Sequence, residues 1–435
     1  MKKSIVFILA AMMVCACLFA GCAAPGNTST DTATQSEPAA PEATATAQTP
    51  AEPVEIHYAY WASPMDAFYA ECKTAFEASH PNIKIILEPT AWTEYWTKLE
   101  TATTGGSVAD VFHMNGVNIL KYADGGVLLP LNDYIANSSV DLNNYPKAMN
   151  DMYNYKGTQF GIAMDYDTIG LWYNKTLFDQ AGIAYPTSDW TWDDLAEAAA
   201  AITALGNDIY GIAAGFEEQA GFYNTVFANG GWLVNGDTFG FDDPNTRAGI
   251  QCWVDLMKAG YSPSEASLEE NASYLQFMAG KLGMIFSGDW MAAYYSSADS
   301  TVAAVCDVAE LPLMSNGARA SVIHGKANCI SASSAHPDEA WAWVEYLAGA
   351  EANKRLGEMG IAIPSYMEYS SLFFASYPQY NMSIYSKAAE EYSYTYPASL
   401  ARPDWMDIVR TELQKAFSLQ VTVDQACDAI MDQLG

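Results

Sequence analysis

The fold is decided by the stretch EIHYAYW at residues 55–61 and by the alternation that follows it. Ile56, Tyr58 and Tyr60 recur at period two, which predicts a strand with one apolar face. Apolar residues at helical spacing come next, then a second strand, and the pattern repeats. The predicted order strand, helix, strand, helix, strand covers residues 55–61, 65–79, 83–87, 93–104 and 108–114.

Strands that alternate with helices favour an α/β fold with a mostly parallel sheet. In such sheets ligands bind beyond the carboxyl ends of the strands. Trp61 ends the first predicted strand, and Asn115 directly follows the third. Both side chains are therefore candidates for ligand contact.

The amino terminus carries the marks of an export signal. Two lysines precede an apolar run, residues 5–20, which is short for a transmembrane helix. We therefore expect residues 1–21 to be a signal peptide that is removed on export. No later apolar stretch is long enough to span a membrane.

The signal ends in FAGC at residues 19–22, which resembles the bacterial lipobox with Phe where Leu is usual. The resemblance implies that Cys22 is lipidated and becomes the first residue. The protein would then be extracytoplasmic and held at the outer face of the cytoplasmic membrane through its lipid anchor only. The alternative is an ordinary signal cut near Ala20 or Ala24, which leaves a freely secreted protein.

Residues 22–53 form the expected tether. After the cysteine they are almost entirely Ala, Pro, Thr, Ser, Gln and Glu, without an aromatic residue. Such a composition cannot bury a core and stays disordered. A random coil of this length spans about 30 Å, which separates the folded part from the bilayer.

The remaining chain, about 380 residues, exceeds the usual size of one compact core, so two lobes are expected. The formal net charge is -31, from 51 acidic and 20 basic residues, and it makes nucleic acid a poor partner. Five cysteines remain after the signal and the lipidated residue are set aside. They show no CxxC pair and no metal-ligand spacing, so we expect buried thiols, with one disulfide as the alternative.

Several blocks carry a more specific signal. They are FEASHPNIK at 76–84, GVLLPLN at 126–132, GLWYNKTLF at 170–178 and WTWDDL at 190–195. Together they resemble the extracellular solute-binding proteins of family 1, the receptors of ABC importers, which include the maltodextrin-binding proteins. The resemblance extends over nearly the whole chain after the tether.

The resemblance implies a two-lobed periplasmic-binding-protein-like α/β fold (class II), in which a hinge joins discontinuous lobes and the solute lies in the cleft between them. Closure of the lobes around the solute is the implied mechanism. The implied crossings lie near residues 165–169, near 303–308 and after 347. The N-terminal lobe would comprise 54–165 and 303–347, and the C-terminal lobe 166–302 and 348–435.

The implied function is that of a monomeric receptor, without cofactor or metal, that hands a small solute to the transmembrane subunits of an ABC permease. A neutral mono- or oligosaccharide suits the composition, which includes 12 Trp, 27 Tyr and 17 Phe. Aromatic faces match the apolar face of a sugar, and polar side chains match its hydroxyl rim.

The candidate ligand-binding residues come from strand ends and from positions where the family contacts its ligands. They are Trp61, Asn115, Asp165, Tyr166, Glu218, Phe222, Trp232, Trp290, His324 and Trp405. For most of the aromatic residues core packing is an equal alternative, and Trp61 and Trp290 are the strongest candidates. Asp165 could instead anchor the hinge, Asn115 could cap a helix, and His324 could be structural.

Two other classes of protein stay open. A tethered carbohydrate-active enzyme would need two facing carboxylates, but adjacent acids such as Glu217-Glu218 and Glu269-Glu270 do not face one another and favour a solvated surface. No GxSxG, HExxH or P-loop motif is present. A scaffold or adhesin would lack a closing cleft. Within the receptor class, glycerol phosphates, peptides and metal chelates are the rival solutes.

Overall fold

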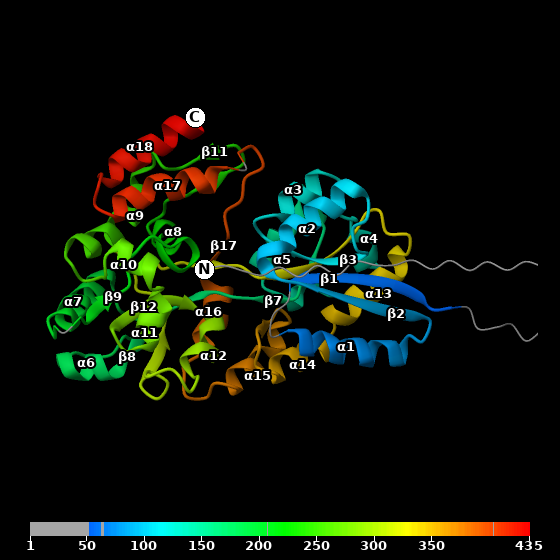
Figure 1. Ribbon diagram of the computed structural model, residues 1–435, viewed down its shortest axis with the longest axis horizontal. Helices are drawn as coiled ribbons and strands as arrows, with labels where there is room; N and C mark the ends of the chain where they lie inside the picture. Colours follow the sequence, from blue (N-terminus) through cyan, green and yellow to red (C-terminus); the bar gives the residue numbers. More distant parts are fainter. Residues whose placement is uncertain (1–51, 62–64, 207, 403) are drawn as a thin grey trace, which may run out of the picture. The chain divides into compact units, whose positions relative to one another are not determined.

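The computed structural model describes residues 52–61, 65–206, 208–402 and 404–435 (Figure 1). The predicted signal, Cys22 and nearly all of the predicted tether lie outside these residues. Within the described part, no helix combines the length and apolar character needed to cross a membrane.

The first sheet has the strand order β2-β1-β3-β15-β6. Its strands are β1 (Val54–Trp61), β2 (Ile83–Thr90), β3 (Val111–Asn115), β15 (Lys326–Ile330) and β6 (Ile162–Ala163). The period-two pattern of β1 places Ile56, Tyr58 and Tyr60 in the core. β1 runs parallel to β2 and β3, whereas β15 is antiparallel to β3 and β6. The predicted strand-helix alternation is thus confirmed, but the sheet is mixed.

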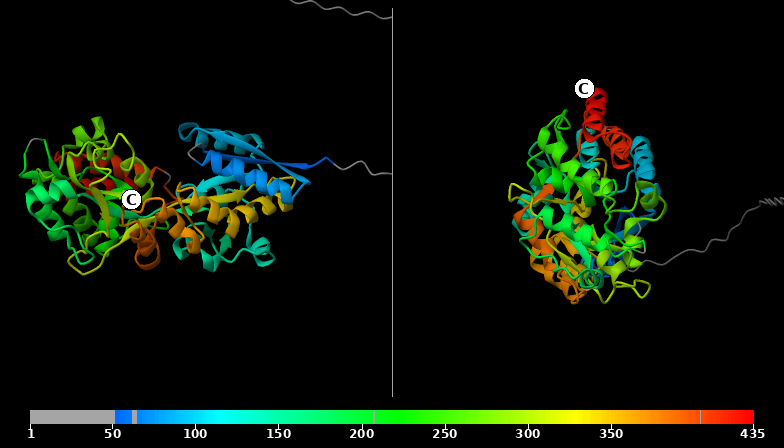
Figure 2. Two further views of the ribbon diagram at one scale, coloured as in Figure 1. Left: turned by 90° about the horizontal axis from the view of Figure 1, so that it is seen from below. Right: turned by 90° about the vertical axis from the view of Figure 1, so that its left-hand side faces the viewer.

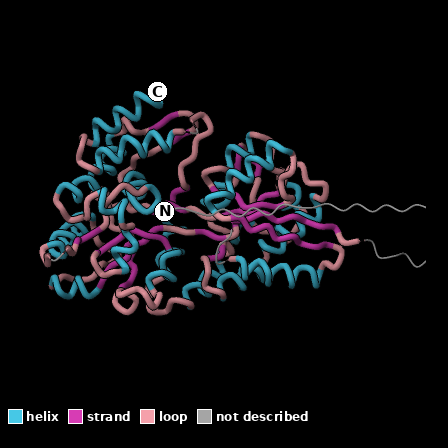
Figure 3. Tube along the Cα trace, in the orientation of Figure 1, coloured by secondary structure: helices cyan, strands magenta, loops and turns pink. Residues whose placement is uncertain are grey.

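Helices cover both faces of the first sheet (Figure 3). The first two are α1 (Asp66–Ser79) and α2 (Trp92–Gly105), within a few residues of their predicted ranges. α1 buries Phe68, Tyr69, Cys72 and Phe76 and lies beside α13 (Pro337–Ala348), as Figure 2 shows in blue and yellow.

The second sheet has the order β13-β8-β12-β9. Its strands are β13 (Cys306–Ala309), β8 (Ile169–Asn174), β12 (Leu282–Gly288) and β9 (Tyr210–Ile212). β12 is antiparallel to β8 and parallel to β9, and both β8 and β12 are buried along their whole length. The core around this sheet is completed by α7 (Trp192–Thr203), α9 (Pro244–Lys258), α17 (Trp405–Phe417) and α18 (Val423–Leu434).

Further elements connect and cover the two sheets. The helices are α3 (Ile119–Asp124), α4 (Asn132–Ala136), α5 (Lys147–Met152), α6 (Lys175–Ala181), α8 (Tyr223–Ala228), α10 (Glu265–Glu270), α11 (Ser273–Met278), α12 (Ala292–Tyr295), α14 (Ala350–Glu358), α15 (Ser370–Ala375) and α16 (Ser383–Glu391). The short strands are β4 (Asn154–Tyr155), β5 (Thr158–Gln159), β7 (Asp165–Tyr166), β10 (Val234–Asn235), β11 (Thr238–Phe239), β14 (Ser321–Ile323), β16 (Ile363–Pro364) and β17 (Ser393–Thr395).

The chain passes between the sheets at the expected first crossing, where β7 pairs with β16. The return passage comes later than residues 303–308, because β13 occupies those positions and pairs with β8 in the second sheet. The third crossing, expected after residue 347, also comes later than predicted. α14 packs in the same hydrophobic core as the first sheet, where Leu356 is buried. Its Arg355 forms an ion pair with Glu71 of α1 at 2.8 Å.

All five cysteines of the described residues are free thiols. Cys72, Cys306, Cys329 and Cys427 are buried, and Cys252 is half-buried. The predicted buried thiols are therefore confirmed for four of the five positions.

Candidate functional site

A cavity of about 400 Å³ lies at the carboxyl ends of β9 and β12. These two strands are parallel, so the residues that follow them meet at one edge of the second sheet. Residues 215–217 come from the segment after β9, and Trp290 comes from the 3-10 helix after β12. α10, α11, α9 and α17 complete the wall. We call this cavity the sheet-edge pocket.

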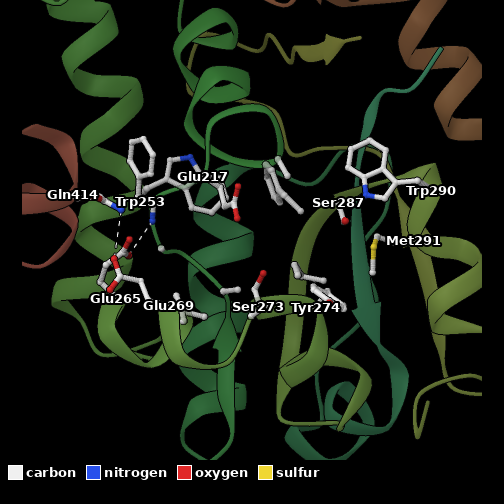
Figure 4. A pocket seen from close by; sticks show the side chains of 18 residues that line it. Glu217, Trp253, Glu265, Glu269, Ser273, Tyr274, Ser287, Trp290, Met291 and Gln414 are labelled. Carbon is white, nitrogen blue, oxygen red and sulfur yellow. Dashed lines mark hydrogen bonds between the residues drawn. The ribbon is translucent and has the colours of Figure 1, made fainter. Parts of the chain in front are cut away.

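Trp290 supplies an aromatic face to the sheet-edge pocket (Figure 4). Its side chain is 38% exposed, which is unusual for so large an apolar group. Its ring lies across Gly288, where an added Cβ would come within 1.9 Å of the ring atom Cζ3. The absence of a side chain at residue 288 therefore allows the indole to occupy this position.

Trp253 of α9 is a second aromatic residue in the wall. It is 1% exposed, and its Nε1 donates a hydrogen bond to Oγ1 of Thr225 at 3.0 Å. Its ring packs edge-on against Phe286 of β12, with 4.8 Å between ring centroids. Since its polar edge is already bonded, Trp253 offers only apolar ring surface.

Three carboxyl groups line the same pocket: Glu217 after β9, and Glu265 and Glu269 of α10. Glu265 is buried, accepts a hydrogen bond from the backbone N–H of Phe216 at 3.0 Å, and has its pKa raised by burial. Glu269 accepts a bond from Nε2 of Gln414 at 3.5 Å. Figure 4 shows Glu265 and Glu269 on the side opposite Trp290, with Glu217 between this pair and Trp290.

Glu217 is exposed to solvent, and the part of the surface that it occupies is the wall of the pocket, so other protein groups lie around it. The pKa of Glu217 is raised to about 7, mainly by burial and to a smaller extent by the neighbouring carboxylates of Glu218 and Glu265. Arg410 opposes this effect. The group is therefore poised between its neutral and charged forms near neutral pH.

The backbone around Glu217 is irregular. Residues 218–222 form a π-helical turn in which Ala220 and Gly221 have non-helical dihedral angles. Gly215 lies so close to α10 that an added Cβ would approach Oε2 of Glu265 to 2.8 Å. This close approach positions the segment after β9 against the carboxyl groups of α10.

Of the ten predicted ligand-binding residues, the structure places Trp290 in the wall of this pocket. The neighbouring Glu217, rather than Glu218, faces it. Glu218 is instead paired with Arg410, whose guanidinium lies 3.1 and 3.2 Å from the two carboxylate oxygens.

Three of the predicted aromatic residues lie in the interior. Phe222 and Trp405 are 1% and 2% exposed in the second core, and Tyr166 is buried with its hydroxyl 2.7 Å from Oγ of Ser386. Trp232 is half-buried and packs over Gly240, where an added Cβ would touch its ring. These positions favour the packing alternative.

Three predicted polar residues have structural partners. Asn115 is buried and accepts hydrogen bonds from the backbone and side chain of Asn118, at 3.1 and 2.9 Å. Asp165 accepts from the backbone N–H of Lys326 at 2.9 Å and forms an ion pair with its ammonium group. His324 packs against Tyr396, and burial lowers its pKa to about 4.

Trp61 is half-buried at the end of β1. Its ring makes edge contacts with Trp92 and Tyr95, each at 5.2 Å between centroids, and with His113 at 4.7 Å. Trp92 of α2 is 50% exposed. Trp61 and Trp92 therefore form an aromatic cluster on the first sheet, separate from the sheet-edge pocket.

Sequence reasoning missed Glu265 and Glu269, because acidic residues on this helix suggested a solvated surface. Their spacing is a usable signal, since residues four apart share one face of a helix. Among the described residues, no group of three or more His, Cys, Asp or Glu side chains is arranged to hold a metal ion.

Comparison with known proteins agrees with this architecture. The family model of the bacterial extracellular solute-binding proteins matches residues 58–354, more than half of the chain. A binding protein of Brucella abortus (strain 2308) is 24% identical over 303 residues, which are 68% of this chain and 71% of that protein. The mannitol-binding protein of Pseudomonas aeruginosa is 24% identical over 293 residues, covering 65% and 66% of the two chains.

A solved structure of an ABC substrate-binding protein from Listeria monocytogenes, in complex with cycloalternan, is also similar. It has a TM-score of 0.78 and 25% identity, and the match covers 88% of this chain and 98% of the other. These proteins bind solutes rather than catalyse reactions, and the predicted two-lobed α/β fold is confirmed. The chain belongs to the bacterial extracellular solute-binding proteins, the extracytoplasmic receptors of ABC transporters.

Proposed function

We propose that this protein captures a neutral mono- or oligosaccharide by lobe closure and delivers it to the permease of an ABC importer, without chemical turnover. The observation that carries the proposal is the exposed ring of Trp290 beside carboxyl and amide groups in one pocket. An aromatic face and nearby hydrogen-bond acceptors match the two surfaces of a sugar ring.

The named ligands of two relatives support a sugar. One relative is named for mannitol, and the solved Listeria protein holds cycloalternan. The ten ligand-binding residues predicted from the sequence differ in the support they receive. Trp290 keeps its proposed role with Glu217 added, whereas Phe222 and Trp405 are proposed as core residues.

A thermal-shift screen over neutral sugars tests the proposal. We expect at least one sugar to raise the melting temperature of the mature protein, and Trp290→Ala to weaken this shift. Tyr185→Ala is the matched control, since Tyr185 is 37% exposed and lies outside the pocket. Stabilisation by glycerol 3-phosphate or a peptide, with no response to any sugar, would overturn the substrate class.

We also propose that the protein acts as a monomer anchored by a lipid on Cys22, next to its permease. Anchoring is tested with Cys22→Ser. The wild type should fractionate with the membrane, and the variant should be released. Release of both proteins would remove the anchor but leave the proposed binding function in place.

A further inference from the structure

The charged side chains in the wall of the sheet-edge pocket are all acidic. The wall contains Glu217, Glu265 and Glu269, and none of its described lining residues is Lys, Arg or His. Arg410 of α17, which acts on the pKa of Glu217, is paired with Glu218 at 3.1 and 3.2 Å and does not line the pocket. A solute in this pocket therefore meets acceptors and negative charge.

The three carboxyl groups differ in the hydrogen bonds that they accept from the protein. Glu265 accepts from the backbone N–H of Phe216, and Glu269 accepts from Gln414. The carboxyl group of Glu217 has no hydrogen-bond partner among the described residues. The carboxyl oxygens of Glu217 are therefore the ones that can form hydrogen bonds with a ligand.

Two physical effects give Glu217 a preference among ligands. An anionic group placed near Glu217 adds like-charge repulsion to the repulsion that Glu218 and Glu265 already exert on its carboxylate. A protonated amine has the opposite effect, since it neutralises this charge and donates charge-assisted hydrogen bonds. The exposed ring of Trp290 in the same wall also attracts cations.

We propose that Glu217 sets the charge selectivity of the sheet-edge pocket: the sugar ring that enters carries no anionic group, and an amino group on that ring is bound in preference to a hydroxyl. This inference rests on the proposed sugar-receptor function and extends its substrate class from neutral sugars to sugars that carry a protonated amine. Uronates and sugar phosphates are excluded, and sugars with a free amine are favoured.

The test is calorimetric titration at neutral pH and low salt with matched sugars. The monosaccharide sets are glucose, glucosamine and glucuronate, with the corresponding galactose and mannose sets. Cellotriose and the glucosamine trisaccharide of chitosan form a longer pair that differs only in the 2-substituents. We expect the amine to bind about tenfold more tightly than its hydroxyl counterpart and the uronate about tenfold more weakly.

Glu217→Gln should bring each set of affinities to within about threefold, because the amide keeps the shape but removes the charge. Glu270→Gln is the matched control: Glu270 is an exposed acid of α10 outside the pocket, and its loss should leave the order unchanged. As a measurement free of any mutation, the amine preference of the wild type should shrink as salt is added.

The possible results separate the two proposals. If sugars bind but the wild type shows no preference by charge, or if Glu217→Gln retains the preference, the charge selectivity is wrong while the receptor function stands. If no sugar of any charge binds, the proposed function itself fails.

Discussion

At the residue scale, Gly288 and Trp290 depend on one another. The indole occupies space that any side chain at 288 would fill, since an added Cβ would lie 1.9 Å from the ring. Gly288→Ala should therefore displace the indole toward solvent, where it is already 38% exposed. We expect sugar affinity to fall about 2- to 10-fold, the range of about 0.5–1.5 kcal/mol for an aromatic contact.

Calorimetric titration with the best sugar of the screen checks this expectation. Gly105→Ala is the control, because a Cβ there would have its nearest contact at 3.7 Å and the backbone angle is ordinary. If Gly288→Ala and Gly105→Ala bind the sugar equally well, the position of the Trp290 ring does not matter for binding.

Glu217 also predicts a dependence of stability on pH. Its pKa rises from 4.5 to about 7 on folding, so the folded state holds this proton more tightly than the unfolded chain. The resulting stabilisation is complete below pH 4.5 and is lost as the pH rises through 7. Glu217→Gln should then be more stable than the wild type above pH 7, by about 1 kcal/mol after allowance for solvent screening.

Urea unfolding across this pH range measures the difference. The two proteins should have equal free energies of unfolding at the acidic end and diverge as the pH rises. A constant difference at every pH would show that Glu217 titrates normally and that the amide acts through packing alone.

The sequence could indicate the type of residue in the site better than its position. Trp290 was predicted from its match to the family's Trp after a buried strand, and it lines the sheet-edge pocket. Glu218 was predicted, whereas Glu217 lines the pocket, and an irregular turn with non-helical angles at Ala220 and Gly221 directly follows this pair. A turn of this kind has no periodic signal in the sequence.

At the element scale, Gln219 links the pocket segment to the first crossing. Its Nε2 donates to Oδ1 of Asp167 at 2.5 Å, and the backbone of Asp167 pairs with His324 on the returning chain. The pKa of Asp167 is raised to about 7 by burial and by Asp165, so loss of this donor leaves a carboxyl group poorly satisfied. Gln219→Leu should cost about 1.5–3 kcal/mol of unfolding free energy.

Chemical denaturation provides the comparison. Gln251→Leu is the control, because Gln251 makes the same kind of bond to Asp255, at 2.8 Å on the exposed face of α9. A change within about 0.5 kcal/mol is expected there. Equal losses in both variants would mean that the bond at the crossing contributes no more than a surface bond.

Local sequence patterns predicted where helices and strands occur better than they predicted which strands pair with one another. The alternation of residues 55–114 identified β1, β2 and β3: β1 carries a period-two signal, and β3, which is buried at every residue, was predicted from its place in the strand-helix order. Nothing near residue 326 indicates that β15 joins these strands, since that pairing spans more than two hundred residues. The placement of β13 beside β8, rather than in the first lobe, is a long-range outcome of the same kind.

At the scale of the whole molecule, the sheet-edge pocket belongs to only one of the two sheets. The sheet-edge pocket is built entirely from residues 213–291 and Gln414, around the second sheet. The aromatic cluster of Trp61 and Trp92 lies on the first sheet and does not line that pocket. A sugar bound at Trp290 would therefore need lobe closure before it could contact the first lobe.

This reasoning leads to a prediction about closure. A sugar present at a hundredfold its dissociation constant should raise the free energy of unfolding by about 2.7 kcal/mol. If the lobes close on it, small-angle X-ray scattering should also show a smaller radius of gyration than for the free protein. Trp290→Ala at the same sugar concentration should show a reduced effect in both measurements. Stabilisation of the wild type without any change in radius would mean that the pocket binds sugar without lobe closure.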